Sequence, residues 1–270
     1  FTLTDTTLAN GESASSTVGL LPGTYKVSEV LPTGWEDPQI VCSVNGGAAN
    51  NGSGYQITGL ETTITLKAGD TVACTYTNVE KARLKIIKTT APAGQGPFTF
   101  TDVDDNVTGL PTGLSDGDSF TSDYLTMGTY NVAETILAGW EIASIVCNDP
   151  DGGTKYDTKA GTIAFDLDPG ELVDCTVNNR AQGRILLEKE TDPLSEDGTF
   201  TYTQGGGITD FDDDSTWGSG TSGELSTTNG KDGWLSGYVT AGTYTISEDT
   251  LPAEWNLADI TCQETNVLTG

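Results

Sequence analysis

Residues 23–30 read GTYKVSEV, and this short alternating stretch decides the fold of the chain. Side chains alternate between the two faces of an extended strand, so Tyr25, Val27 and Glu29 share one face. The tyrosine and the valine mark that face as the buried one. The stretch therefore predicts a β-strand that directs a carboxylate into its own core.

The stretch is part of a tandem repeat. It recurs as GTYNVAE at 128–134 and as GTYTISE at 242–248. Each copy is followed by a tryptophan, and then by an isoleucine and a cysteine two positions apart. These residues are Trp35, Ile40 and Cys42, then Trp140, Ile145 and Cys147, then Trp255, Ile260 and Cys262. The period of about 100 residues is the length of a domain rather than of a solenoid unit.

The composition favours small all-β domains. Only 35% of the 270 residues are hydrophobic, and short alternating runs are separated by turn residues. We expect three tandem Ig-like β-sandwiches at 1–81, 82–182 and 183–270, the third with a long insertion at about 204–238. The junctions NVEKARLKII and NNRAQGRILL are not rich in Gly, Ser or Pro, which favours a stiff rod.

The chain is strongly acidic and contains no histidine. Its 12 basic and 39 acidic residues give a net charge of −27. Because phosphate binding needs Lys and Arg, nucleic acid is excluded as a partner. The lack of histidine removes the commonest general base, so we expect no enzyme acting on an external substrate. No apolar run reaches the roughly 18 residues of a membrane-spanning helix, so no membrane span is expected in this segment.

The cysteines form two pairs with the same local pattern, an I-x-C strand followed by a later C-T strand. We predict disulfides Cys42–Cys74 and Cys147–Cys175, with free buried thiols as the alternative. Zinc is disfavoured because the sequence offers no histidine and no closely spaced cysteine pair. Disulfides indicate an oxidising, extracellular compartment. Cys262 remains unpaired in the sequence.

Each repeat also directs polar residues into its core. In RLKIIKTT, at 83–90, Lys88 ends an apolar row, and in LVDCTVNN, at 172–179, Asn179 ends another. Glu134 has the same inward position in the strand between them. A lone buried charge costs several kcal/mol, so we expect these three side chains to meet.

The other repeats carry partial sets, Glu29 with Asn78 in the first and Lys189 with Glu248 in the third. Asn178 is the weaker partner in the middle repeat, because alternation turns it away from the core.

Two interpretations of the complete set remain open. The first is a buried Lys–Glu ion pair whose hydrogen bonds are completed by the asparagine. The second is a single-turnover reaction, in which burial frees the Lys88 amine to attack the Asn179 side-chain amide with loss of ammonia. Glu134, and by equivalence Glu29 and Glu248, would be the proton shuttle.

Taken together, I-x-K, G-T-Y-x-[VI]-x-E with L-x-x-x-W, and the closing T-x-T-N or T-V-N-N resemble the Cna B-type repeats of Gram-positive surface adhesins and pilins. The resemblance covers essentially the whole chain. It implies a prealbumin-like (transthyretin-like, reverse immunoglobulin) fold. We expect no cofactor, with Ca²⁺ as the alternative. The resemblance also implies an intramolecular isopeptide bond between Lys88 and Asn179, with Glu134 as its catalyst.

Two further groups of residues are candidates for ligand sites. Trp217 and Trp234 lie outside the repeat pattern, so they are candidates for a ligand or subunit contact, with packing of the insertion as the alternative. Clustered carboxylates could bind Ca²⁺, although neither cluster has the full EF-hand spacing. They are Asp102, Asp104 and Asp105, and Asp210, Asp212, Asp213 and Asp214.

These features predict an extracellular cell-surface structural protein, a stiff stalk or head-to-tail filament of stapled repeats. The alternative is a surface adhesin that binds a ligand through the third-repeat insertion. The first repeat begins without its lysine-bearing opening strand, and the third stops before its closing strands. We therefore expect a longer chain or neighbouring copies to donate the missing strands, which would propagate a fibre.

Overall fold

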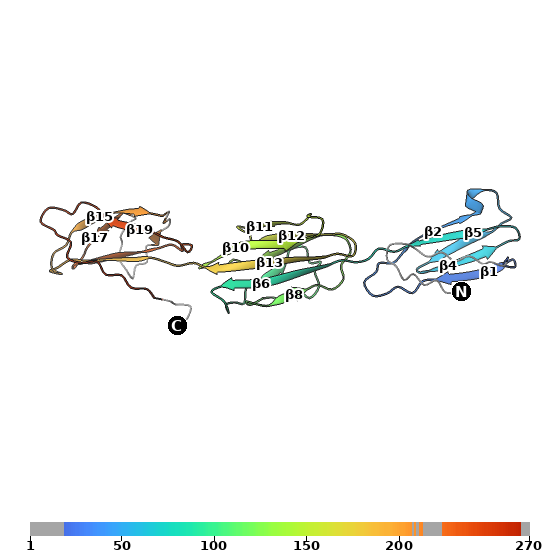
Figure 1. The fold of residues 1–270 in the computed structure, drawn as a ribbon, viewed down its shortest axis with the longest axis horizontal. Coiled ribbons are helices and arrows are strands. Elements are labelled where there is room, and N and C mark those ends of the chain that lie inside the picture. The colour runs from blue at the N-terminus through green and yellow to red at the C-terminus, as the bar shows by residue number, and fades with distance from the viewer. Residues whose placement is uncertain (1–18, 207, 209–210, 213–222, 266–270) are drawn as a thin grey trace.

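The computed structural model of the chain describes residues 19–206, 208, 211–212 and 223–265. Its strands form three groups that follow one another along the long axis of the molecule (Figure 1). The expected all-β class, with tandem sandwich domains in a rod, is confirmed. No helix in the described ranges is long and apolar enough to cross a membrane.

The middle repeat is a sandwich of two four-stranded sheets. One sheet has the order β10-β13-β6-β8 and the other the order β11-β12-β9-β7. Within the first sheet, β6 and β13 are parallel neighbours. The strands are β6 (Arg83–Ala91), β7 (Phe100–Asp102), β8 (Ser119–Thr121), β9 (Gly128–Glu134), β10 (Trp140–Asn148), β11 (Lys155–Asp157), β12 (Thr162–Leu167) and β13 (Leu172–Ala181).

Alternation along these strands forms the core between the two sheets. Leu84 and Ile86 of β6 and Val177 of β13 face Val132 of β9 and Phe165 of β12, and all five are buried. Burying each such side chain stabilises the fold by about 1.5–3 kcal/mol relative to leaving it exposed. Since Lys88, Asn179 and Glu134 continue the same inward rows, the packing that forms the core also carries them into it.

The first repeat contains the equivalent sheets with fewer strands. Their orders are β1-β4-β3 and β2-β5, corresponding to β9-β12-β11 and β10-β13. Among the described residues nothing pairs with the second edge of β5, the edge at which β13 holds β6. The elements are β1 (Gly23–Ser28), β2 (Gln39–Val44), η1 (Asn45–Gly47), β3 (Gly54–Thr58), β4 (Glu61–Leu66) and β5 (Val72–Thr77).

The third repeat contains the complementary part of the sandwich. Its sheets have the orders β14-β18-β16 and β17-β15-β19, in which β14 and β18 correspond to β6 and β8. In the described part of this repeat, no strand takes the place of β13 beside β14. The strands are β14 (Leu186–Glu190), β15 (Thr199–Gly205), β16 (Phe211–Asp212), β17 (Glu224–Ser226), β18 (Lys231–Ser236) and β19 (Thr245–Glu248).

The third-repeat insertion is shorter than the sequence predicted. Leu187 of β14 lies opposite Trp234 of β18, as Ile86 of β6 lies opposite Phe120 of β8. The expected insertion at about 204–238 is therefore wrong at its end, because β17 and β18 belong to the repeated framework. Most of the added length lies between β15 and β17, and a smaller part lies between β17 and β18.

Candidate functional site

The candidate site is a buried cluster of Lys88, Glu134 and Asn179 in the middle repeat. Lys88 lies on β6 opposite Val177 of the parallel strand β13, and Asn179 lies two residues further along the same face of β13. Glu134 ends β9 in the facing sheet. The first strand, the last strand and a strand of the opposite sheet thus converge on one point of the core.

The three side chains are enclosed and in contact. Lys88 and Asn179 are 0% exposed and Glu134 is 4% exposed. Lys88 Nζ lies 3.6 Å from Glu134 Oε2, and Asn179 Nδ2 donates a hydrogen bond to Glu134 Oε1. Lys88 Nζ also donates to the carbonyl oxygen of Val177 at 3.3 Å and lies 4.5 Å from the centre of the Phe98 ring.

Burial shifts both ionisable groups toward their neutral forms. Removal from water lowers the pKa of Lys88 to about 8, against the opposing attraction of the Glu134 carboxylate. The same desolvation raises the pKa of Glu134, against the opposing charge of Lys88 and the hydrogen bond from Asn179. Both shifts favour the uncharged form, an amine on Lys88 and a carboxylic acid on Glu134.

Two oxygens of the cluster are available for further bonding. Glu134 Oε2 and Asn179 Oδ1 are buried and have no hydrogen-bond partner within the part of the chain that the structure describes. An amide can be rotated to exchange its oxygen and nitrogen, so a protonated Glu134 could donate to Oδ1. That hydrogen bond would polarise the carbonyl carbon next to the lysine amine. The cluster can therefore present an amine nucleophile, an amide electrophile and a proton shuttle together.

The first repeat contains the glutamate and asparagine of this cluster. Asn78 Nδ2 donates to Glu29 Oε1 at 2.5 Å. Glu29 Oε2 and Asn78 Oδ1 are buried without a hydrogen-bond partner among the described residues. This is the arrangement of Glu134 and Asn179 without a lysine from the described chain.

The third repeat contains the lysine and the glutamate. Lys189 Nζ lies 2.6 Å from Glu248 Oε1 and 4.1 Å from the centre of the Phe200 ring, which corresponds to Phe98. The Tyr202 hydroxyl donates to Glu248 Oε1 at 3.3 Å. Both charged side chains are slightly exposed, at 14% and 12%, so this pair is less enclosed than that of the middle repeat.

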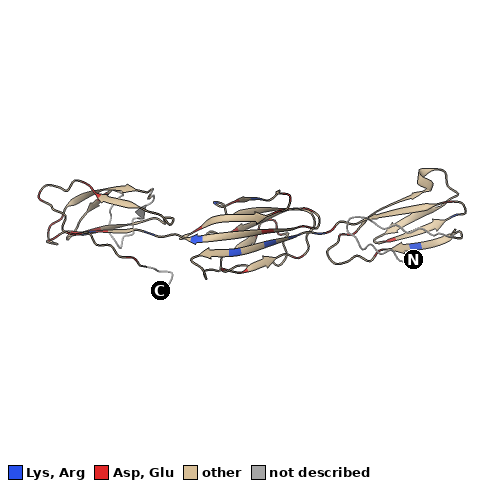
Figure 2. Ribbon diagram, viewed as in Figure 1, with Lys and Arg blue, Asp and Glu red and all other residues tan. Residues whose placement is uncertain are grey.

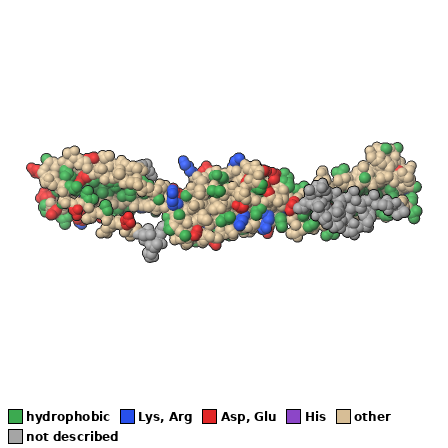
Figure 3. Space-filling view, in the orientation of Figure 1, with side chains coloured by type: hydrophobic (Ala, Val, Ile, Leu, Met, Phe, Trp, Pro, Cys, Tyr) green, Lys and Arg blue, Asp and Glu red, His purple; other side chains and the backbone are tan. Residues whose placement is uncertain are grey.

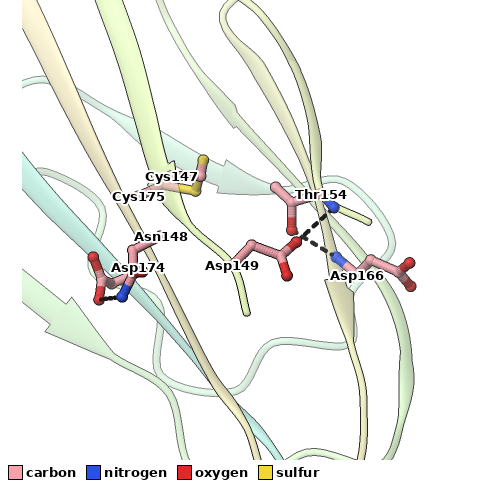
Figure 4. The surroundings of a disulfide bond; sticks show 7 residues. All are labelled: Cys147, Asn148, Asp149, Thr154, Asp166, Asp174 and Cys175. Carbon is pink, nitrogen blue, oxygen red and sulfur yellow. Dashed lines mark hydrogen bonds between the residues drawn. A yellow bond between two sulfur atoms is a disulfide. The ribbon is translucent and has the colours of Figure 1, made fainter. Parts of the chain in front are cut away.

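Two disulfides link neighbouring strands, one in the first repeat and one in the middle repeat. Cys42 is bonded to Cys74 between β2 and β5, and Cys147 to Cys175 between β10 and β13. In each case the cysteines are direct partners in neighbouring strands of one sheet. Figure 4 shows the second disulfide next to the hydrogen bond that the Asn148 side chain donates to the Asp174 side chain. These two residues are the adjoining pair of the same two strands. Cys262 is a free, exposed thiol.

Two of the predicted calcium ligands accept hydrogen bonds in and around the loop after β7. Asp102 accepts hydrogen bonds from the backbone of Asp104 and Val107, and Asp104 accepts one from Asn131. These contacts close the loop after β7. No shared site of the run 210–214 can be described, because Asp210, Asp213 and Asp214 and the side chain of Asp212 lie outside the described residues.

A different acidic group could hold a cation. One carboxylate oxygen each from Asp149, Asp151 and Glu171 lies within 4.8 Å of the others. Asp149 anchors this loop by accepting a 2.7 Å hydrogen bond from the Thr154 backbone (Figure 4). The run DPDG at 149–152 was the only sequence signal, because Glu171 comes from a distant loop. The ribbon in Figure 2 shows acidic residues on all three repeats and basic residues mainly on the middle repeat, and Figure 3 shows Lys and Arg side chains on the surface of the middle repeat.

The predicted role of Trp234 as a surface contact is wrong. Its side chain is 1% exposed and packs in the core of the third repeat with Phe200 and Leu225. Trp234 occupies the position that Phe120 holds in the middle repeat, so its size reflects core packing. Trp217 lies outside the described residues.

Comparison with known proteins identifies related domains. The profile of a family described as a prealbumin-like fold domain matches residues 1–80, 84–181 and 185–268. No curated protein sequence matches the chain.

Among solved structures, the Bacillus anthracis TIE protein is 16% identical with a TM-score of 0.31, covering 87% of this chain and 47% of its own. A streptococcal ancillary pilin is 12% identical with a TM-score of 0.27, covering 79% and 77%. The pilus adhesin SpaC of Lactobacillus rhamnosus GG is 8% identical with a TM-score of 0.20, covering 87% and 51%. The chain thus spans about half the length of the first and third of these proteins.

Proposed function

Since the chain belongs to the family of prealbumin-like fold domains and contains three copies of this domain, we propose that it is an extracellular structural stalk cross-linked by covalent bonds. The staple of the middle repeat is an isopeptide bond between Lys88 and Asn179. The observation that supports this proposal is the enclosed cluster of Lys88, Glu134 and Asn179, in which burial lowers the pKa of the amine and raises that of the acid.

The reaction needs no external reagent. The neutral Lys88 amine attacks Cγ of Asn179 while Glu134 donates its proton to the amide oxygen. The Nζ–Cγ bond forms, the Cγ–Nδ2 bond breaks, and the proton lost by Nζ leaves on the departing ammonia by way of Glu134. Glu134 ends as it began, and the reaction occurs once. We propose no turnover of an external substrate.

The position of the bond suits a protein under tension. A chain pulled at its ends is loaded at the start of β6 and at the end of β13, which are parallel neighbours. Such a force shears the two strands past each other. A covalent bond from Lys88 to Asn179 would carry the force directly from the first strand to the last. The Cys147–Cys175 disulfide further ties β13 to β10.

We propose that the stalk extends by accepting strands at its outer repeats. A lysine-bearing strand beside β5 would complete the Glu29–Asn78 pair. An asparagine-bearing strand beside β14 would complete the Lys189–Glu248 pair. Both would reproduce the parallel pairing of β6 and β13, and a contact that does not close on itself extends into a filament. The alternative adhesin function depends on the third-repeat insertion, and no contact of the described residues favours it.

Intact mass spectrometry of the reduced, denatured protein tests the proposal. We expect a mass lower than the sequence mass by one ammonia, with the cross-linked peptides containing Lys88 and Asn179. The Glu134→Gln variant is expected to keep the full mass. Glu141→Gln is the matched control, because Glu141 is paired with Arg180 on the surface of the same repeat. A wild-type protein of full sequence mass would overturn the staple.

A further inference from the structure

The first junction between repeats is formed by specific contacts of an arginine, a tyrosine and a glycine. The Arg83 guanidinium carbon lies 5.3 Å from the centre of the Tyr124 ring, and its Nε donates to the carbonyl oxygen of Ser122 at 2.8 Å. From the preceding repeat, the Gly34 carbonyl accepts a 2.8 Å hydrogen bond from the Lys81 backbone. A Cβ on Gly34 would lie only 2.8 Å from the Tyr124 ring. The ring thus fills the space that a side chain at residue 34 would need.

The second junction repeats this contact residue for residue. Arg184 lies 5.4 Å from the centre of the Tyr238 ring, and its Nε donates to the carbonyl oxygen of Ser236 at 2.6 Å. The Gly139 carbonyl accepts a 2.8 Å hydrogen bond from the Gln182 backbone. A Cβ on Gly139 would lie 2.9 Å from the Tyr238 ring. Two copies of one arrangement at equivalent places indicate a specific joint.

The third copy of the turn shows why the glycines are needed. Gly34 and Gly139 have φ values of 92° and 80°, and the equivalent residue before Trp255 is Glu254, with φ of 76°. Its turn is closed as in the second repeat, by a backbone bond from the tryptophan to the residue three positions earlier. The positive φ therefore does not itself require glycine. What distinguishes the first two turns is the tyrosine ring packed against them.

The first repeat lacks the tyrosine at the equivalent position. Tyr124 and Tyr238 each stand four residues before the glycine of the GTY motif, and the same position in the first repeat is Gly19. The joint residues therefore occur at both internal junctions. In the first repeat Gly19 stands in the place of the tyrosine, and in the third repeat Glu254 stands in the place of the glycine.

The segments that link the repeats are also held by backbone hydrogen bonds. At the first junction the Gly170 N–H donates to the carbonyl oxygen of Glu80, and at the second the backbones of Gly183 and Val239 pair. A hollow of about 510 Å³ lies beside the second junction, between Pro92 of the middle repeat and Tyr244 of the third.

From these observations we infer that glycine, tyrosine and arginine form an interlocking joint that makes the three repeats one rigid body. The far side of the first repeat lacks the tyrosine and the far side of the third repeat lacks the glycine, so this joint would not hold a further domain at either place. The rigid unit of the stalk is then the set of three repeats. The joint does not depend on the Lys88–Asn179 bond, so either can fail without the other.

Backbone NMR relaxation of the full chain tests this joint, because each repeat reports its own rotational correlation time. We expect one shared value in the wild type. The Gly34→Glu variant introduces the residue found naturally in the third turn, so the turn itself is tolerated. We expect it to shorten the correlation time of the first repeat by about twofold or more, since the rigid mass is smaller, while the other two repeats stay coupled. Gly139→Glu is expected to release the third repeat instead.

Gly59→Glu is the matched control. Gly59 lies in the first repeat with φ of 57°, and a Cβ there meets no atom within 4 Å. It is expected to leave one shared correlation time. Tyr124→Ala removes the ring without altering the turn and is expected to behave as Gly34→Glu does. An intact Cys42–Cys74 bond and dispersed first-repeat resonances show that each variant is folded. Separate correlation times in the wild type, or one shared value in Gly34→Glu, would overturn the inference.

Discussion

Replacing Lys88 by methionine together with Glu134 by glutamine distinguishes the covalent staple from a simple buried ion pair by the size of its effect. Methionine and glutamine have volumes similar to those of the residues they replace and carry no charge. The double substitution therefore removes the bond without leaving an uncompensated buried charge.

The two interpretations differ by several kcal/mol. A bond from Lys88 to Asn179 closes a loop of about 90 residues, which contributes ~4–5 kcal/mol in the chain-entropy model. The Cys147–Cys175 disulfide lies inside this loop and shortens it, so ~4 kcal/mol remains. If the bond were absent, replacing both partners of the buried ion pair by uncharged side chains of similar volume would be close to neutral.

Hydrogen exchange in the full chain measures this difference within the middle repeat. The amides of Val132 and Val177 lie on core strands and report its global unfolding. A loss of ~4 kcal/mol makes their exchange in the Lys88→Met, Glu134→Gln double variant about a thousandfold faster than in the wild type. Unchanged or slower exchange would refute the covalent account and leave the ion pair.

Three further predictions concern the surrounding structure. Replacing both Cys147 and Cys175 by alanine removes a link across 28 residues, and the same exchange measurement should show a loss of ~3–4 kcal/mol; equal exchange would contradict it. Trp234→Ala should lower the denaturant midpoint of the third repeat by the equivalent of ~3–5 kcal/mol, because this side chain fills the core, and an unchanged midpoint would show that it does not. Hydrogen bonding to Asp168 and then Asp149 raises the pKa of Asp151 to about 6 from 3.8, so the folded state holds this proton more tightly than the unfolded state. The Asp151 contribution is therefore fully present below about pH 4 and lost as the pH rises through about 6; Asp151→Asn should remove this slope from a urea-unfolding series, and an unaltered slope would exclude Asp151 as its source.

The sequence could predict the strands and the core because both follow from alternation and repetition. The GTY-x-x-x-E stretch placed Glu134 on the inner face of its strand, and the apolar rows did the same for Lys88 and Asn179. The structure shows that these rows meet, since β6 and β13 are parallel neighbours. Comparison between the repeats thus identified the inward polar positions that belong together, which the pattern of a single strand could not do.

Other features depend on contacts that alternation does not encode. The sequence pattern did not assign Trp234 to the repeat, because the equivalent core position in the middle repeat is a phenylalanine, Phe120. Asp151 and Glu171 come together from loops whose positions depend on the whole sandwich. The tyrosines of the junctions pack against glycines of the preceding repeat. Only the structure of two adjoining repeats shows that the tyrosine ring fills the space a side chain on the glycine would need.

Single-molecule stretching of the reduced chain tests the central claim most directly. With the disulfides open, the Lys88–Asn179 bond alone would keep the residues between them from extending. We predict that the wild-type chain reaches a full length roughly 300 Å shorter than Glu134→Gln, since an extended residue spans at most ~3.3–3.6 Å. Equal full lengths in the two proteins would contradict the account of a covalently stapled stalk.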